Sequence, residues 1–117
     1  MYVYIIECED GSLYTGIAKD VVQRLRQHYH HLTGCAKYTL SHQMKDIRAV
    51  WETEDKVTAC RLEYWIKRLT RKQKLNLIES PETIGFVLPN QEDWPISVVK
   101  IELSEVTNLK VSRKLAW

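Results

Sequence analysis

The chain has 117 residues and a mass of 13.8 kDa, the size of one domain that can bury a core without disulfides or a structural metal. Its formal charge of +2 comes from 17 basic and 15 acidic residues, which argues against a polybasic protein. Hydrophobic residues make up 44% and charged residues 27%, so disorder is disfavoured, and no stretch approaches the roughly 20 apolar residues of a membrane span.

The N-terminus and the cysteines indicate the compartment. The first residues carry no basic flank and meet Glu7 too early for a signal peptide. Cys8, Cys35 and Cys60 are an odd number at wide spacings, which favours free thiols. We therefore expect a cytoplasmic protein with no membrane partner, and a monomer and a weak dimer both stay open.

The N-terminal part predicts a β-hairpin followed by a helix. Residues 2–8 and 13–18 are rich in β-branched and aromatic residues, and Asp10-Gly11 between them is a turn signal. Asp20 is suited to cap the helix that follows, in which apolar residues recur at helical spacing. This helix should end near Thr33-Gly34, because glycine suits a helix C-terminus.

The middle of the chain predicts a loop, a strand and a helix, in that order. Residues 34–46 carry no regular pattern and are expected to form a loop. Residues 47–53 are apolar enough for a third strand. Either Asp55 or Thr58 can cap the helix that follows.

The last third predicts one more helix and one more strand. Thr70 can cap a helix that Ser80-Pro81 ends, since a residue before proline avoids helical geometry. Residues 90–95 suggest a loop and residues 96–103 a strand, whereas 109–115 fit a short helix or an edge strand. These elements indicate an α+β fold with a small antiparallel sheet of about three strands flanked by helices.

Short motifs at regular spacing carry a resemblance to a known family. Tyr2-Val3-Tyr4 is followed ten residues later by Tyr14-Thr15-Gly16, ten more lead to Arg24, and Glu63 lies on a later helix. This combination resembles the GIY-YIG nuclease domain over residues 2 to about 80, and in particular its small stand-alone bacterial branch, UPF0213. The resemblance implies a GIY-YIG nuclease-like domain at 1–80. Residues 81–117 lie beyond it, and we expect them to form an extension that packs on the same domain and adds a strand.

Four positions depart from the family pattern. Tyr2 and Val3 stand where the first motif has glycine and isoleucine, and Thr15 replaces the isoleucine of the second motif. Ile17 occupies a position where some members carry a lysine that assists proton transfer. That role is left to a tyrosine or to His28.

The resemblance implies a role for each motif residue in phosphodiester hydrolysis. Glu63 would bind Mg²⁺ or Mn²⁺, because a carboxylate with open metal positions leaves room for waters and phosphate. Arg24 would stabilise the phosphate in the transition state, since a guanidinium matches its oxygens. Tyr4, Tyr14 and His28 are candidates for the group that takes a proton from water, and His28 titrates nearest to neutral pH.

Helical and strand spacing partly agree with such a site. Arg24 and His28 lie one turn apart on the same flank of their helix. Tyr4 and Tyr14 share a face of the hairpin only if its loop suits them, because a two-residue Asp10-Gly11 turn would place them on opposite faces. We therefore predict a three-residue or bulged loop, in which the numbers of paired residues sum to 22.

Basic residues are expected to bind the phosphate backbone of DNA, or of RNA, around this site. The candidates are seven basic residues and one tyrosine: Lys19, Arg26, Lys37, Tyr38, Lys67, Arg68, Arg71 and Lys72. The four histidines lack the spacing of a zinc site. The sequence thus predicts a metal-dependent endonuclease acting on DNA. The alternatives are a non-catalytic nucleic-acid-binding module and a protein-interaction domain that uses the extension.

Overall fold

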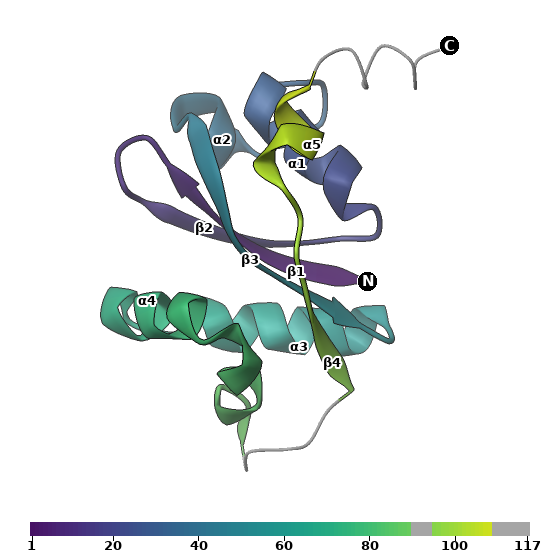
Figure 1. The fold of residues 1–117 in the computed structure, drawn as a ribbon, viewed down its shortest axis with the longest axis vertical. Coiled ribbons are helices and arrows are strands. Elements are labelled where there is room, and N and C mark those ends of the chain that lie inside the picture. Colours follow the sequence, from purple (N-terminus) through teal and green to yellow (C-terminus); the bar gives the residue numbers. More distant parts are fainter. Residues whose placement is uncertain (90–94, 109–117) are drawn as a thin grey trace.

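The fold is a four-stranded antiparallel sheet with helices on both faces (Figure 1). The computed structural model describes residues 1–89 and 95–108. Its elements are β1 (Tyr2–Cys8), β2 (Leu13–Ala18), α1 (Val21–His30), α2 (Lys37–Ser41), β3 (Met44–Thr53), α3 (Lys56–Lys67), α4 (Arg71–Glu79), the 3₁₀ helix η1 (Pro81–Phe86), β4 (Ile96–Val99) and α5 (Leu103–Thr107). The strand order is β2-β1-β3-β4. The predicted α+β class is confirmed, and β4 is the strand that the extension adds.

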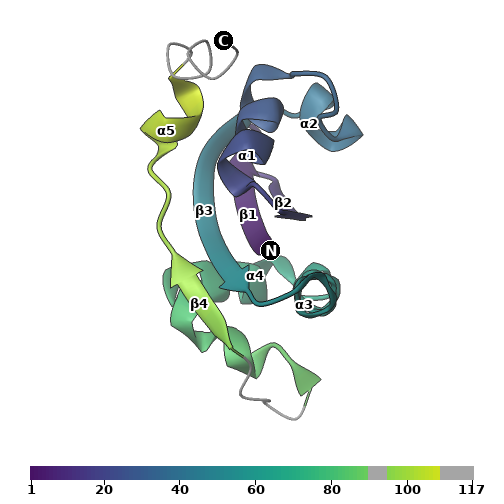
Figure 2. The same ribbon diagram turned by 90° about the vertical axis from the view of Figure 1, so that its right-hand side faces the viewer.

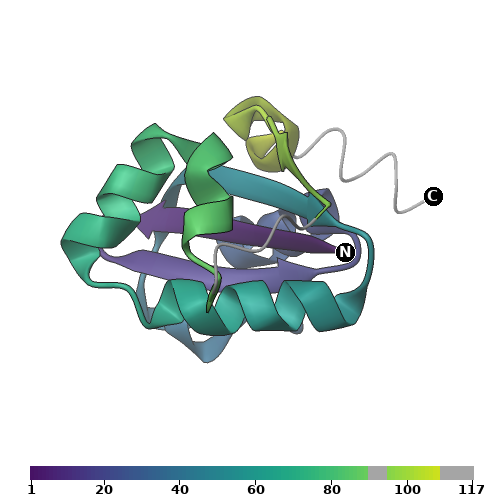
Figure 3. The same cartoon turned by 90° about the horizontal axis from the view of Figure 1, so that it is seen from below.

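Successive residues of β1 point to opposite faces of the sheet, and both sets are buried. Val3 and Ile5 pack with α3 and α4, whereas Tyr4 and Ile6 pack with α1. Figure 3 shows α3 and α4 lying across the face opposite to α1. Because β1 is central and covered on both sides, its tyrosine-containing motif lies inside the molecule.

The backbone bond between Cys8 and Ser12 closes a loop of three residues, 9–11, between β1 and β2, and a three-residue loop is what the sequence predicted. Cys8 donates its N–H to Ser12 O at 2.9 Å, and Gly11 donates its own to Cys8 O at 2.9 Å. Gly11 has a φ of +84°, which glycine adopts without strain. The numbers of paired residues sum to 20 rather than 22, so the loop begins one residue earlier than predicted. The even sum still places Tyr14 on the face of Tyr4.

Helix α1 begins as predicted and ends earlier. The Asp20 carboxylate accepts the N–H of Gln23 at 3.1 Å, which confirms the N-cap. The predicted end near Thr33-Gly34 is wrong, because His31 adopts a left-handed conformation with a φ of 52° and ends the helix at His30. The chain turns there toward α2.

The segment predicted as a loop between residues 34 and 46 contains α2, and β3 begins at Met44 rather than at residue 47. Helix α2 has no side-chain cap at its N-terminus. Its Thr39 is fully buried against α1. Tertiary contact therefore supports this turn of helix, and the local sequence gives no signal for it.

The caps of α3 and α4 fit their sequence signals. Asp55 caps α3 by accepting the N–H of Thr58 at 2.8 Å, which decides between the two candidates. Thr70 and Gln73 form a capping box at the start of α4. The helix ends before Ser80-Pro81, as predicted.

The extension crosses from one layer to the other. β4 pairs with the second half of β3, and the chain then leaves the sheet so that α5 packs on α1 (Figure 2). The prediction of a strand through residue 103 is wrong beyond Val99, because Glu102 and Glu105 form a capping box that starts α5. The predictions for residues 90–94 and 109–117 lie outside the described part of the chain.

Candidate active site

A buried chain of hydrogen bonds joins three elements on the α1 face of the sheet. Tyr4 Oη on β1 lies 2.6 Å from His28 Nε2 on α1. His28 Nδ1 lies 2.8 Å from Thr39 Oγ1 on α2. Tyr4 is 1% exposed, and His28 and Thr39 are fully buried. The three side chains are held in place by packing as well as by hydrogen bonds.

Gly16 on β2 leaves the space that Tyr4 occupies. Gly16 is the partner of Tyr4 in the sheet, and the tyrosine ring lies across its backbone. A Cβ at Gly16 would lie 2.4 Å from Tyr4 Oη and 2.6 Å from Tyr4 Cζ, which is closer than atoms can approach. The glycine of the second motif is thus required for the position of the tyrosine of the first.

Burial keeps both members of the tyrosine–histidine pair neutral. The pKa of Tyr4 is raised above its ordinary value by burial and by neighbouring Tyr14, although the Arg24 guanidinium acts in the opposite direction. The pKa of His28 is lowered from 6.5 to about 4 by burial and then by Arg24. The expectation that His28 titrates near neutral pH is therefore wrong.

An aromatic row leads from this pair toward the surface. The Tyr14 ring lies 6.5 Å from that of Tyr4 and 5.5 Å from that of His28, measured between centroids. Tyr14 stacks on Tyr38 at 5.3 Å, and Tyr38 stacks on His42 at 4.0 Å. Tyr14 and Tyr38 are half-buried, so the row runs from the buried pair to the surface.

Arg24 is half-buried and oriented by two acceptors. Its Nη1 donates to Gln27 Oε1 at 3.0 Å and to Gly34 O at 2.5 Å. A guanidinium carries five N–H donors, so these bonds leave others for a phosphate. Arg24 and His28 share one flank of α1, as the helical spacing predicted. Both act on Tyr4: His28 as a hydrogen-bond partner, and Arg24 through a hydrogen bond and its positive charge.

Glu63 reaches the site around the free edge of the sheet. It lies on α3, which packs against the edge strand β2. Its carboxylate is 3.4 Å from Lys67 Nζ, and that ammonium lies 6.0 Å from the centre of the Tyr14 ring. The negative charge of Glu63 raises the pKa of Tyr4 further. The side chains of α3 and of the opposite face therefore meet at this edge.

The residues present fit a divalent cation that keeps most of its water. The Glu63 side chain is 23% exposed and can exchange its Lys67 contact for a metal. Among residues 1–89 and 95–108, no group of three or more histidine, cysteine, aspartate or glutamate side chains is placed to hold a metal. A single carboxylate suits Mg²⁺, which is commonly held by one or two carboxylates with waters and phosphate oxygens.

Most of the predicted nucleic-acid contacts lie on the surface. Exposed positions are occupied by Lys19, Lys37, Lys67, Arg68, Arg71 and Lys72. Arg71 Nη2 approaches the β1–β2 loop near Gly11. At the α3–α4 junction, Lys67 therefore lies near Tyr14 of β2 and Arg71 near the β1–β2 loop.

Arg26 is the exception, and the prediction of a phosphate contact is wrong for it. Its side chain is 5% exposed, and Nε and Nη2 donate to Glu105 O at 2.9 and 2.6 Å. His30 lies beside it, with Nε2 3.0 Å from Val106 O. Both side chains bind the backbone of α5, so this face of α1 anchors the extension.

Two residues of the site could not have been found from spacing. Thr39 follows the candidate Tyr38 in the sequence, but nothing in the sequence shows that it contacts His28. Gly16 belongs to the second motif, yet only the register shows which side chain lies across it.

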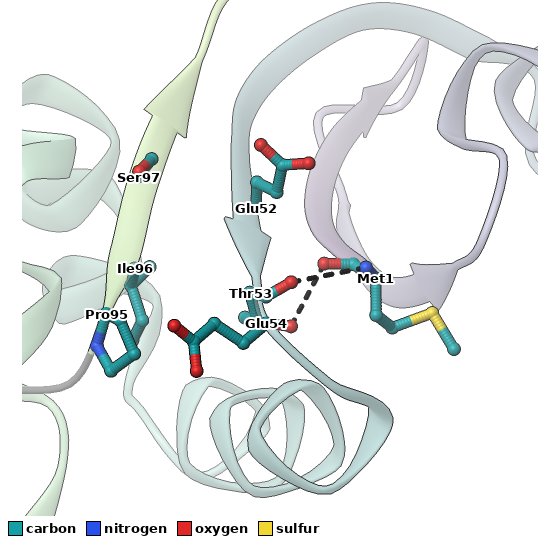
Figure 4. A pocket seen from close by; sticks show the side chains of 7 residues that line it. All are labelled: Met1, Glu52, Thr53, Glu54, Pro95, Ile96 and Ser97. Atoms are coloured by element: carbon teal, nitrogen blue, oxygen red, sulfur yellow. Dashed lines mark hydrogen bonds between the residues drawn. The ribbon is translucent and has the colours of Figure 1, made fainter.

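A pocket of about 520 Å³ lies away from these residues, between the first residue of the chain and the start of β4 (Figure 4). Glu52 and Glu54 line it, together with Thr53, which bonds with Met1. None of the predicted site residues contributes to it.

In the part of the chain that the structure describes, no helix has the length and apolar character needed to span a membrane.

The chain is similar to known proteins. The model of the GIY-YIG catalytic domain matches residues 1–76. The UPF0213 protein FN1575 of Fusobacterium nucleatum is 42% identical over 100 residues, covering 86% of this chain and 96% of that protein. The UPF0213 protein CPE1444 of Clostridium perfringens is 44% identical over 80 residues, covering 68% and 83%.

A solved structure is also similar. The solution NMR structure of the UPF0213 protein BH0048 from Bacillus halodurans is 40% identical, with a TM-score of 0.45, and the match covers 68% of this chain and 82% of that one. The domain match and the two sequence relatives show that the chain belongs to the GIY-YIG family and, within it, to the UPF0213 proteins.

Proposed function

We propose that this protein is a divalent-metal-dependent endonuclease that hydrolyses phosphodiester bonds of DNA. The observation that carries the proposal is the buried hydrogen bond from Tyr4 to His28, next to the Arg24 guanidinium. A buried phenol and a buried neutral imidazole at 2.6 Å form a route for a proton. Membership of a family of nuclease domains supports the same reaction class.

The proton of the attacking water would pass to Tyr4 Oη while the Tyr4 proton passes to His28 Nε2. The O–H bond of Tyr4 breaks as a new one forms, so the phenol stays neutral and the imidazole becomes an imidazolium. This route avoids a resting phenolate, which the raised pKa of Tyr4 disfavours. His28 is closed to solvent and would act only through Tyr4.

Arg24 and Glu63 would handle the charge of the phosphate. The guanidinium of Arg24 is held by Gln27 and Gly34, so its remaining N–H groups can face a phosphate without further ordering. Glu63 would hold Mg²⁺ or Mn²⁺, and such a cation neutralises phosphate charge and stabilises the leaving oxygen when bound. Tyr14 would position Tyr4 through its ring contact.

The exposed basic residues would bind the nucleic-acid backbone. Lys67, Arg68, Arg71 and Lys72 lie next to Glu63 in sequence or along the α3–α4 junction. Contacts with phosphates are independent of base identity, so binding should depend strongly on salt.

The proposal is tested by nicking of supercoiled plasmid DNA with Mg²⁺, with Mn²⁺ and with a chelator. Removal of the metal should abolish cleavage. Glu63→Gln and Arg24→Ala should each reduce it by roughly 100-fold or more. Glu79→Gln is the matched control for Glu63, because it removes an exposed carboxylate from the neighbouring helix α4.

Binding of Mn²⁺, measured by electron paramagnetic resonance, separates the loss of cleavage in Glu63→Gln from that in Arg24→Ala. Glu63→Gln should weaken binding of the cation, whereas Arg24→Ala and Glu79→Gln should leave it intact. Cleavage that persists in both Glu63→Gln and Arg24→Ala would contradict the assignment.

A further inference from the structure

The hydroxyl of Thr39 has only one proton, and the two partners of its oxygen indicate where that proton goes. Thr39 Oγ1 lies 3.1 Å from Ala36 O. A carbonyl oxygen can only accept a hydrogen bond, so Thr39 is the donor of that bond. The hydroxyl is therefore left with its lone pairs for any other partner.

The second partner of the Thr39 hydroxyl is His28 Nδ1, at 2.8 Å. Because the Thr39 proton is already committed to Ala36, the proton of this bond has to come from Nδ1. Burial and Arg24 keep His28 uncharged at neutral pH, and a neutral imidazole carries one N–H only. Nε2 is thus a bare acceptor, and Tyr4 Oη donates to it at 2.6 Å.

We propose that Thr39 is a positioning residue for the cleavage reaction, because its hydroxyl fixes His28 in the Nδ1–H tautomer that can accept the proton of Tyr4. The inference rests on the proposed function. In the opposite tautomer, Nε2 would carry a proton and would donate to Tyr4, so the histidine could not take the tyrosine proton. One hydroxyl group thereby sets the direction of the whole chain of hydrogen bonds.

The proposal also gives helix α2 a role. This helix has five residues and no side-chain cap, and it precedes the polar turn into β3. Its Thr39 is fully buried, whereas Lys37 and Leu40 on the same helix are exposed. The turn of helix brings the hydroxyl and the Ala36 carbonyl together, which is the arrangement that commits the proton.

Thr39→Val tests the proposal because valine has nearly the same shape and no hydroxyl. His28 Nδ1 would lose its acceptor, and both tautomers would become accessible. Cleavage should fall by roughly 100-fold, with the loss in kcat rather than in DNA binding. Thr39→Ser retains the hydroxyl and should restore most of the activity.

Thr83→Val is a matched control on the far face of the sheet. The Thr83 hydroxyl also donates to the carbonyl three residues earlier, Ser80 O, at 2.6 Å. This variant loses the same type of bond without touching His28, so its cleavage rate should equal that of the wild type.

The tautomer itself is measured on the same 117-residue chain by ¹⁵N NMR of the imidazole nitrogens at pH 7. In the wild type and in Thr39→Ser, Nδ1 should give the signal of a protonated nitrogen and Nε2 that of a bare one. In Thr39→Val this pattern should be lost or reversed, while circular dichroism shows a folded protein.

Each result decides one way. A wild-type spectrum with the proton on Nε2, or a Thr39→Val spectrum identical to wild type, overturns the inference. A Thr39→Val enzyme that cleaves as fast as wild type also overturns it. A wild type that cleaves no DNA overturns the proposed function and with it the catalytic purpose of Thr39, whereas the spectra still decide the hydrogen-bond assignment.

Discussion

Tyr4 Oη and His28 Nε2 lie 2.6 Å apart, although the two residues are 24 positions apart in the chain and neither is open to solvent. The bond ties the central strand β1 to the helix α1. Burial raises the pKa of the tyrosine and lowers that of the histidine, so the proton rests on the phenol. The pair is therefore neutral at rest and oriented for transfer from tyrosine to histidine.

Tyr4→Phe removes the hydroxyl and keeps the ring. Cleavage of plasmid DNA should fall by roughly 100-fold or more, because the proton route begins at this oxygen. The free energy of unfolding, measured in urea, should fall by about 1–3 kcal/mol, since His28 Nε2 loses its buried donor. Tyr14→Phe leaves the Tyr4–His28 bond intact and should be the milder change. The reverse order of activities would assign the proton transfer to Tyr14.

Gly16→Ala should displace the Tyr4 ring from its position over the backbone of β2. The new methyl group would lie 2.4 Å from Tyr4 Oη, so the ring has to move and the bond to His28 lengthens. We expect a loss of about 1–3 kcal/mol in unfolding free energy and a large loss of cleavage. Gly11→Ala is the control. Gly11 has a positive φ, so an alanine there should also lower the stability, but it lies in a loop distant from Tyr4. Equal cleavage rates in the two variants would show that the position of Tyr4 does not limit the reaction.

The parts of the fold that the sequence predicted depend on local signals. The alternating strands and the caps at Asp20, Asp55 and Thr70 are each determined within a few residues. The flank shared by Arg24 and His28 follows from the helical repeat alone. The resemblance implied that these helical residues and Tyr4 belong to one site, but it did not predict the bond between Tyr4 and His28, which is a long-range contact.

The parts that the sequence did not predict depend on contacts between distant segments. Helix α2 is too short to form alone, and its buried Thr39 shows what holds it. Arg26 looks like any basic helix residue until α5 is placed over it, and the sequence pattern of α5 was interpreted as the end of a strand. A side chain's role could not be assigned before its partner element was known.

The stability of the protein should decrease as the pH falls from about 6.5 to about 4. His28 has an ordinary pKa of 6.5, and burial with Arg24 lowers it to about 4 in the folded chain. Between these values the unfolded chain binds a proton that the folded chain does not, so acid favours unfolding. This difference between the two pKa values of His28 corresponds to a loss of roughly 3 kcal/mol in the free energy of unfolding.

Urea unfolding at a series of pH values measures this effect, with His28→Gln as the comparison. The variant lacks the titrating group and should show a flatter dependence over the same range. Asp10 and Asp55 also have lowered pKa values, but their contributions are lost only as the pH falls below the ordinary value of 3.8. An identical pH dependence in wild type and variant would show that His28 is not the buried neutral group.

Arg26 and Arg68 should behave oppositely in DNA binding, although both are arginines: Arg26 lies within α1 and Arg68 is the C-cap residue of α3. Arg68 is exposed, with its guanidinium 5.1 Å from the Tyr64 ring, whereas Arg26 is buried and bound to Glu105 O. Arg68→Met should reduce the slope of log affinity against log salt by about 0.7–0.9, the share of one phosphate contact. Arg26→Met should leave that slope unchanged and lower the unfolding free energy by about 1.5–3 kcal/mol, because α5 loses two hydrogen bonds from a charged group. Fluorescence anisotropy across a salt series measures the slope, and urea unfolding measures the stability. If Arg26→Met lowers the slope as much as Arg68→Met while the protein keeps its stability, the guanidinium of Arg26 binds phosphate and does not anchor α5.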